Sequence, residues 1–166
     1  MKKIFILVLC FTCFCGCKVK SPNVTAVTTG LSFSAEMLID GVKYKYDTEI
    51  LQDGSIKMAA TEPENIKDLI ISISQGKIKA CYKGLEYNTD IGELPNGVVI
   101  DFLYCVFTDI NSNNKKVSVK EDEFYIKGNT EKYDYTVAFG QSGLPLKIID
   151  KSGIDIIIKN ACIIKK

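Results

Sequence analysis

Strict alternation of apolar and polar residues near the start of the chain constrains its fold more than any other feature. In three consecutive segments, 31–39, 42–50 and 56–60, apolar residues recur at every second position. Asp-Gly pairs stand between these segments, at 40–41 and 53–54. A period of two places the apolar side chains on one face of a strand, and Asp-Gly is typical of hairpin turns. The pattern therefore predicts an antiparallel meander with one apolar and one solvated face.

The alternation returns later in the chain and is interrupted once by a helical pattern. Between Val98 and Ile110, apolar residues recur at intervals of three and four, which predicts one amphipathic helix after Pro95. Further strands are expected at 69–74, 77–83, 116–119, 123–127, 133–139, 146–150 and 154–159, with a last short run at 161–164. An antiparallel sheet of this size must twist and curl. We therefore expect a mainly β domain of about ten strands, curved as a half-barrel around one central helix.

The first seventeen residues have the pattern of a bacterial export signal. Lys2 and Lys3 precede an apolar run of about ten residues, which is typical of a secretory signal peptide and too short for a transmembrane helix. The run ends in Phe-Cys-Gly before Cys17. This stretch resembles the lipobox of bacterial lipoproteins, in which the cysteine is acylated and becomes the new N-terminus. Acyl chains of this kind anchor a protein stably when two or more are present.

The lipobox resemblance divides the chain into three parts. It implies a signal peptide at 1–16, a lipidated Cys17 followed by a flexible tether to residue 29, and a β domain at 30–166. The protein is then expected on the outer face of the bacterial cell membrane, held by its N-terminal lipid. A thiolate metal site is the competing interpretation of the four clustered cysteines, which are Cys10, Cys13, Cys15 and Cys17. We favour the anchor, because three of these cysteines lie within an apolar export signal.

Composition argues against several classes of function. The chain contains no histidine, arginine or tryptophan. Without histidine there is no Ser-His-Asp triad and no His-based zinc site, and without arginine there is no bidentate phosphate clamp. Once Lys2 and Lys3 are removed, 19 basic residues face 20 acidic ones, so the net charge of −1 does not favour nucleic acid. We expect a protein that is not an enzyme and that uses no cofactor or metal.

Three other groups of polar residues admit a functional interpretation beside an ordinary structural one. Residues 109–114 space oxygen ligands like the start of a calcium loop, although Lys120 stands where the bidentate glutamate belongs. The acids at 121–123 offer two carboxylates on one strand face, as glycosidases require. Lys77, Lys79 and Lys83 could approach lipid head groups. The favoured interpretations are a helix-ending turn, a solvated turn and a soluble sheet face.

Three cysteines follow the anchor, Cys81, Cys105 and Cys162. An odd number leaves at least one of them free or paired between chains. Export permits a disulfide without requiring one, and the sequence does not select a pair. Idle thiols are the favoured interpretation, with Cys81 on the lysine-bearing face of its strand and Cys105 on the flank of the helix.

The segment SGLPLKIIDKSGIDIIIKN (142–160) resembles a C-terminal hairpin of the lipoprotein carrier family that includes LolA, LolB and the sensor RseB. The shared features are Gly-Leu-Pro, two apolar strands joined by an Asp-x-x-Gly turn, and a closing asparagine. They are carried by Gly143, Leu144, Pro145, Leu146, Ile148, Asp150, Gly153, Ile156, Ile158 and Asn160. The resemblance implies a half-open β-barrel that curls around helices and holds acyl chains in its concavity. It brings no catalytic residues.

These features together favour non-covalent binding of an apolar or lipidic ligand in the concave face. The residues expected to line the cavity are Phe33, Met37, Tyr44, Tyr46, Phe102, Val106, Phe107, Tyr135 and Phe139. The alternation is equally compatible with a solid core made of the same side chains. The alternative function is a protein-interaction or envelope-sensing module similar to RseB, which would use a sheet edge or the convex face and no small-molecule ligand.

Overall fold

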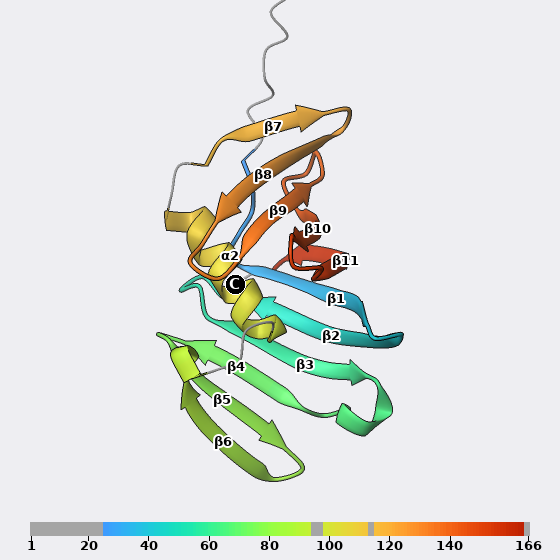
Figure 1. The fold of residues 1–166 in the computed structure, drawn as a ribbon, viewed down its shortest axis with the longest axis vertical. Coiled ribbons are helices and arrows are strands. Elements are labelled where there is room, and N and C mark those ends of the chain that lie inside the picture. The colour runs from blue at the N-terminus through green and yellow to red at the C-terminus, as the bar shows by residue number, and fades with distance from the viewer. Residues whose placement is uncertain (1–24, 94–97, 113–114, 165–166) are drawn as a thin grey trace, which may run out of the picture.

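One antiparallel sheet and one α-helix make up the described part of the chain. The computed structural model describes residues 25–93, 98–112 and 115–164 (Figure 1). The strands are β1 (Leu31–Ile39), β2 (Val42–Ile50), β3 (Ile56–Glu62), β4 (Ile70–Ser74), β5 (Lys77–Tyr82), β6 (Leu85–Asp90), β7 (Val117–Lys120), β8 (Glu123–Asn129), β9 (Asp134–Phe139), β10 (Pro145–Asp150) and β11 (Asp155–Ile163). The helix is α2 (Val99–Ser112), and two short 3₁₀ turns lie at Glu64–Ile66 and Ile91–Glu93.

The sheet consists of two meanders joined through the first and last strands. Its order is β6-β5-β4-β3-β2-β1-β11-β10-β9-β8-β7, so β6 and β7 are the two free edges. Strands β1 and β11 pair antiparallel, with Leu31 opposite Ile163 and Ala35 opposite Ile158. Helix α2 follows β6 and precedes β7 in the chain, so this connection must run from one edge of the sheet to the other. It crosses the face toward which the sheet curls (Figure 1), which we call the concave face.

The core lies between α2 and the concave face. The helix buries Ile100, Phe102, Leu103, Val106 and Phe107 in one hydrophobic cluster with the inward-facing residues of the strands. Aromatic rings join the two layers: Phe107 lies 6.4 Å from Phe33 between ring centroids, and Phe102 meets Tyr133 edge-on at 4.9 Å. Such aromatic pairs stabilise the fold by more than the burial of their apolar surface alone. The apolar face of the predicted helix therefore serves as the cover of the predicted sheet.

The predicted architecture is confirmed: the domain is mainly β, with one curved, unclosed antiparallel sheet and one helix. The sheet has eleven strands, where about ten were predicted, because β6 is not predicted from the sequence. Its residues are nearly all exposed, so burial imposes little alternation on it. The short run expected at 161–164 continues the preceding strand, because β11 extends from Asp155 to Ile163. Within the described residues, no helix is long and apolar enough to cross a membrane.

We expect Phe102→Ala to lower the free energy of unfolding by about 3–5 kcal/mol, because it removes a fully buried ring at the helix–sheet contact. Thr108→Ala is the matched control, since Thr108 lies on the exposed side of the same helix, and its effect should stay within about 0.5 kcal/mol. Urea denaturation of both variants measures the difference. Equal, small effects would contradict a tightly packed layer beneath α2.

Candidate ligand-binding surface on the concave face

The residues predicted to line a cavity lie mostly inside the packed core. Phe33, Met37, Tyr46, Phe102, Val106, Phe107, Tyr135 and Phe139 are buried, and Tyr44 is half-buried against the same cluster. Phe124 stacks on Phe139 with ring centroids 5.1 Å apart. These side chains therefore contact one another between α2 and the sheet. Their role as the lining of a ligand cavity stays a prediction.

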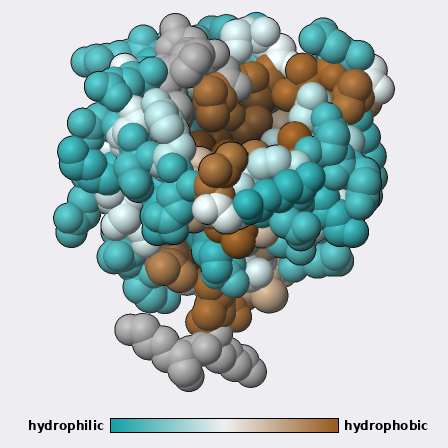
Figure 2. All heavy atoms as spheres, turned by 90° about the horizontal axis from the view of Figure 1, so that it is seen from below, coloured by the Kyte–Doolittle hydropathy of each residue, from teal (hydrophilic) through white to brown (hydrophobic). Residues whose placement is uncertain are grey.

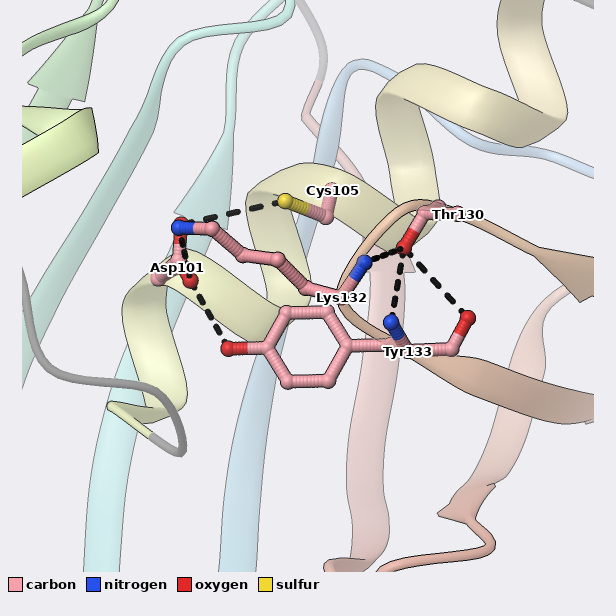
Figure 3. A network of polar contacts seen from close by, with 5 residues as sticks. All are labelled: Asp101, Cys105, Thr130, Lys132 and Tyr133. Atoms are coloured by element: carbon pink, nitrogen blue, oxygen red, sulfur yellow. Dashed lines mark hydrogen bonds and ion pairs between the residues drawn. The ribbon is translucent and has the colours of Figure 1, made fainter.

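A buried carboxylate ties the first half of α2 to the loop between β8 and β9 (Figure 3). The side chain of Asp101 is 0% exposed. It accepts hydrogen bonds from the Tyr133 hydroxyl at 2.7 Å and from Lys132 Nζ at 3.1 Å, and the Cys105 thiol lies 3.7 Å away. Thr130 Oγ1 accepts from the backbone N–H of Tyr133 at 2.9 Å and so fixes the loop. A buried carboxylate is stable only with such partners.

A second carboxylate ties the last half of the same helix to the same arm of the sheet. Asp109 accepts a hydrogen bond from the Tyr135 hydroxyl at 2.7 Å and pairs with Lys115 Nζ at 2.6 Å. Burial, followed by this hydrogen bond, raises the pKa of Tyr135. Gly128, opposite Tyr135 in the ladder, leaves room for the ring, because a Cβ there would meet it. Asp109 is the first oxygen of the calcium-like segment, and here it serves the helix–sheet contact.

Sequence reasoning missed the Asp101 site, although the sequence carries a signal for it. Asp101 interrupts a run of apolar residues, and a polar residue amid apolar ones calls for a buried partner. The partners Lys132 and Tyr133 lie more than thirty positions away, in a loop with no distinctive pattern. The contact is therefore evident only once the fold brings α2 and the β8–β9 loop together.

The concave face continues past the helix onto the hairpin formed by β5 and β6. Residues directly opposite in an antiparallel ladder share a face. Met58, Ile71, Ala80 and Tyr87 lie opposite one another in succession across β3, β4, β5 and β6. Met58 is buried beneath the helix, Ile71 and Ala80 are half-buried, and Tyr87 is 63% exposed. The apolar face of the sheet thus continues from the core to the free edge at β6, where the helix does not cover it.

The same face also opens along the length of the hairpin. Three opposed pairs lie on it, Ile78 with Thr89, Ala80 with Tyr87, and Tyr82 with Leu85. Exposure rises along this series, from buried Ile78 to Leu85, which is 74% exposed beside the β5–β6 turn. We call Ile71, Ala80, Tyr82, Leu85 and Tyr87 the concave platform. From below, Figure 2 shows hydrophobic side chains gathered around a hollow, with hydrophilic side chains on both flanks.

The opposite face of the hairpin, which we call convex, is polar, and its lysines pair with carboxylates on the same face. Lys77 pairs with Asp90 at 2.5 Å, and Lys79 pairs with Glu86 at 2.8 Å. These contacts join β5 to β6 and raise the pKa of both lysines, chiefly through the hydrogen bonds to their carboxylate partners. The lysines at 77 and 79 therefore serve the sheet surface and do not face the platform. Cys81, on the same convex side, is a free thiol near Glu86.

Two grooves flank the exposed side of α2. One, of about 350 Å³, lies between Tyr104, Cys105 and Thr108 of the helix and residues 130–132 of the β8–β9 loop. The other, of about 530 Å³, lies between the same side of the helix and the turns at 52–55 and at Gln75. Their walls carry hydroxyl, amide and carboxylate groups. Both have mixed polar and apolar walls, whereas the side chains of the concave platform are all aliphatic or aromatic.

The remaining predicted sites have separate positions. Glu123, one of the adjacent acids, accepts a hydrogen bond from the Tyr125 hydroxyl at 2.6 Å, and Glu121 lies in a turn with φ of 55°. Cys105 and Cys162 are free thiols, as Cys81 is. Among the described residues, no cluster of potential metal ligands occurs. Cys17, the signal peptide and most of the tether lie outside the described residues, and so do Asn113 and Asn114 of the calcium-like segment.

Comparison with solved structures finds distant similarity. No protein-family model and no curated protein matches the chain. The crystal structure of a LolA superfamily protein from Nitrosomonas europaea superposes on 78% of this chain and 68% of that protein, with 13% sequence identity and a TM-score of 0.44. This similarity is too distant to assign a family, so the fold assignment stands on the strand order and helix of the chain itself.

We expect Asp101→Ala to lower the free energy of unfolding by about 2–4 kcal/mol, because Tyr133 and Lys132 would lose their buried acceptor. Asp155→Ala is the control. Asp155 forms a solvent-exposed pair with Lys147 at 2.8 Å, and the loss of such a pair should cost less than about 1 kcal/mol. Thermal and urea unfolding of both variants tests the contrast, and indistinguishable stabilities would show that Asp101 does not fasten the helix.

The Cys105 thiol should react slowly with alkylating reagents. Burial, followed by the negative charge of Asp101, raises its pKa to about 11, so little thiolate exists at pH 8. In variants that keep a single cysteine, we expect iodoacetamide to modify Cys105 at least about tenfold more slowly than the exposed Cys162 at pH 8. The Cys105 rate should still be rising at pH 10. A rate that levels off by pH 9 would contradict the raised pKa.

Proposed function

We propose that this protein is an exported, membrane-anchored lipoprotein that binds an apolar or lipidic ligand non-covalently on the concave face of its sheet. The observation that carries the proposal is the continuous apolar surface from buried Met58 to exposed Tyr87 and Leu85. Large side chains such as these each contribute about 1.5–3 kcal/mol when they are fully removed from water. A ligand seated on the concave platform would cover them and extend the core outward.

The predicted lipid anchor at Cys17 would place the ligand-binding domain at the membrane. An acylated N-terminus would hold the domain at the membrane surface, within reach of lipids and other apolar molecules of the envelope. The absence of histidine and arginine from the sequence favours binding over catalysis. The proposed ligand site differs from the cavity expected from the sequence. It lies beside the buried aromatic set, on β4, β5 and β6, where the concave face is uncovered.

The first test is a comparison of native and denatured mass. The mature chain, residues 17–166 with Cys17→Ser to prevent acylation, would be expressed for export and purified without detergent. We expect extra mass that is lost on denaturation and that is identified as lipid. Because a weakly held ligand can dissociate, a neutral apolar fluorophore, N-phenyl-1-naphthylamine, would then be titrated into the chain.

The variant Leu85→Ser/Tyr87→Ser should raise the Kd for the fluorophore at least about tenfold, because two apolar contacts are lost. Ile149→Ser/Ile157→Ser is the matched control. It removes two partly exposed apolar side chains from the convex face and should leave the Kd unchanged. A bare-chain mass together with no fluorophore binding, or an equal loss of binding in both variants, would contradict the proposal.

A different observation favours the alternative function, a protein-interaction or envelope-sensing module. Strand β6 is an edge of the sheet, with backbone groups on its outer side open to another strand. An extended peptide can add to such an edge through main-chain hydrogen bonds. A photo-crosslinker at Asn88 of β6 would test this. A single crosslinked envelope protein, together with a lipid-free native mass, would favour the alternative over ligand binding.

A further inference from the structure

The turn between β5 and β6 places a lysine at the open end of the concave platform. Lys83 and Gly84 form this turn, with φ of 48° and 83°. Positive φ at both central residues is characteristic of a type I′ hairpin turn. Lys83 Nζ lies 5.0 Å from the centroid of the Tyr82 ring. The Tyr82 hydroxyl donates to the carbonyl of Asn65 at 2.7 Å, so the ring beneath the ammonium group is held in place.

Lys83 differs from the other lysines of the same hairpin. Lys77 and Lys79 lie on the convex face, and each has a carboxylate partner on β6. Lys83 makes no ion pair within the described part of the chain, and Asp68 acts on it only as a more distant charge. Its contact is instead with an aromatic ring of the platform. A positive charge without a carboxylate at ion-pair distance thus stands over Tyr82, which lies opposite exposed Leu85.

The far end of the hairpin lies near Glu93, whose charge also acts on Lys77 of the convex face. Thr89, on the concave side near the buried end of the platform, donates a hydrogen bond to the carboxylate of Glu93. From the Tyr82–Leu85 pair to the Ile78–Thr89 pair the surface runs four residues, which is about 13 Å. Positive charge at the exposed end and the apolar surface that leads away from it together define a direction. An anionic group is attracted to the turn, and an apolar chain is attracted to the surface behind it.

We propose that the ligand is a single-chain anionic amphiphile of the fatty-acid type, with its acid group beside Lys83 and its acyl chain along the concave platform toward Ile78. This inference rests on the proposed function and specifies its ligand. The acyl chain covers Leu85, Tyr87 and Ala80, and the acid group pairs with the ammonium group at the solvent end. The exposed part of the platform, on β5 and β6, is one hairpin wide and matches one chain rather than a bilayer surface.

The test compares two ligands with the same chain length, laurate and dodecanol, each kept below the concentration at which it aggregates. The mature chain with Cys17→Ser would be titrated with each at pH 8, with displacement of N-phenyl-1-naphthylamine as the measurement. We expect one site and a Kd for laurate about fivefold lower than that for dodecanol, the range of a partly exposed ion pair. The preference should shrink in 0.5 M salt, because screening weakens it.

Variants at the turn assign the preference to one side chain. Lys83→Gln should abolish the preference for laurate and leave the dodecanol Kd unchanged, and Lys83→Glu should reverse the preference. Lys57→Gln is the control, because Lys57 is an exposed lysine on the convex face of β3, and it should keep the wild-type preference. The unchanged dodecanol Kd also shows that each variant is folded.

The outcomes separate this inference from the function on which it rests. Equal wild-type affinity for laurate and dodecanol overturns the anionic head group and leaves apolar binding standing. A preference that survives both Lys83 variants overturns the assignment to Lys83. Binding to anionic phospholipid vesicles without binding to monomeric laurate also overturns the inference. Failure to bind either ligand or the fluorophore overturns the proposed function itself.

Discussion

The burial of one broad apolar sheet face by a single helix is the constraint on which the rest of the structure depends. Eleven strands at the usual spacing of about 4.8 Å would span about 48 Å if the sheet were flat. Helix α2 has fourteen residues and is about 21 Å long. The helix cannot cover such a face, so the sheet must curl toward it. Curling buries the middle strands fully and leaves the outermost strands with less cover.

The two carboxylates of α2 form their hydrogen bonds with the C-terminal arm of the sheet and the loop beside it. Asp101 and Asp109 both bind tyrosines of β9 or the loop before it, and lysines reinforce both contacts. Toward β3 and β4 the helix presents its apolar face to the core. The helix is thus fastened to the C-terminal meander by directional bonds and to the N-terminal meander by packing. Cover is least at the two edges of the sheet, where β6 is nearly all exposed and β7 is exposed throughout.

Much of the fold follows from the sequence because burial on one face imposes a period of two. The segments around Phe33, Tyr46 and Met58 alternate strictly and become central strands, and the helical spacing around Phe102 gives α2. Strand β6 could not be predicted in this way, because hydrogen bonds to β5 hold it in the sheet while its side chains are hardly buried. The pairing of β1 with β11 could not be predicted either, since alternation identifies a strand without identifying its neighbour.

The candidate site was only partly predictable for a related reason. Sequence alternation assigns Tyr46 and Tyr135 to the concave face, but it cannot tell which part of that face the helix covers. The aromatic residues that pack between α2 and the strands are covered and form the core. Tyr87, which has the same chemistry, lies at the edge and stays exposed because α2 does not reach it. Position within the sheet, a property of strand order, therefore decides which aromatic residues can meet a ligand.

The two faces of the β5–β6 hairpin differ in a way that solubility alone does not explain. On the convex face, lysines and carboxylates pair across the strands, which protects an edge against association. The concave face of the same two strands carries Leu85 and Tyr87 at positions where charged residues would protect the edge equally well. Exposed apolar surface at a sheet edge promotes association with other molecules. Its concentration on the face that curls toward α2, beside a lysine without a carboxylate partner in the described chain, fits a surface that a small amphiphile covers when the protein functions.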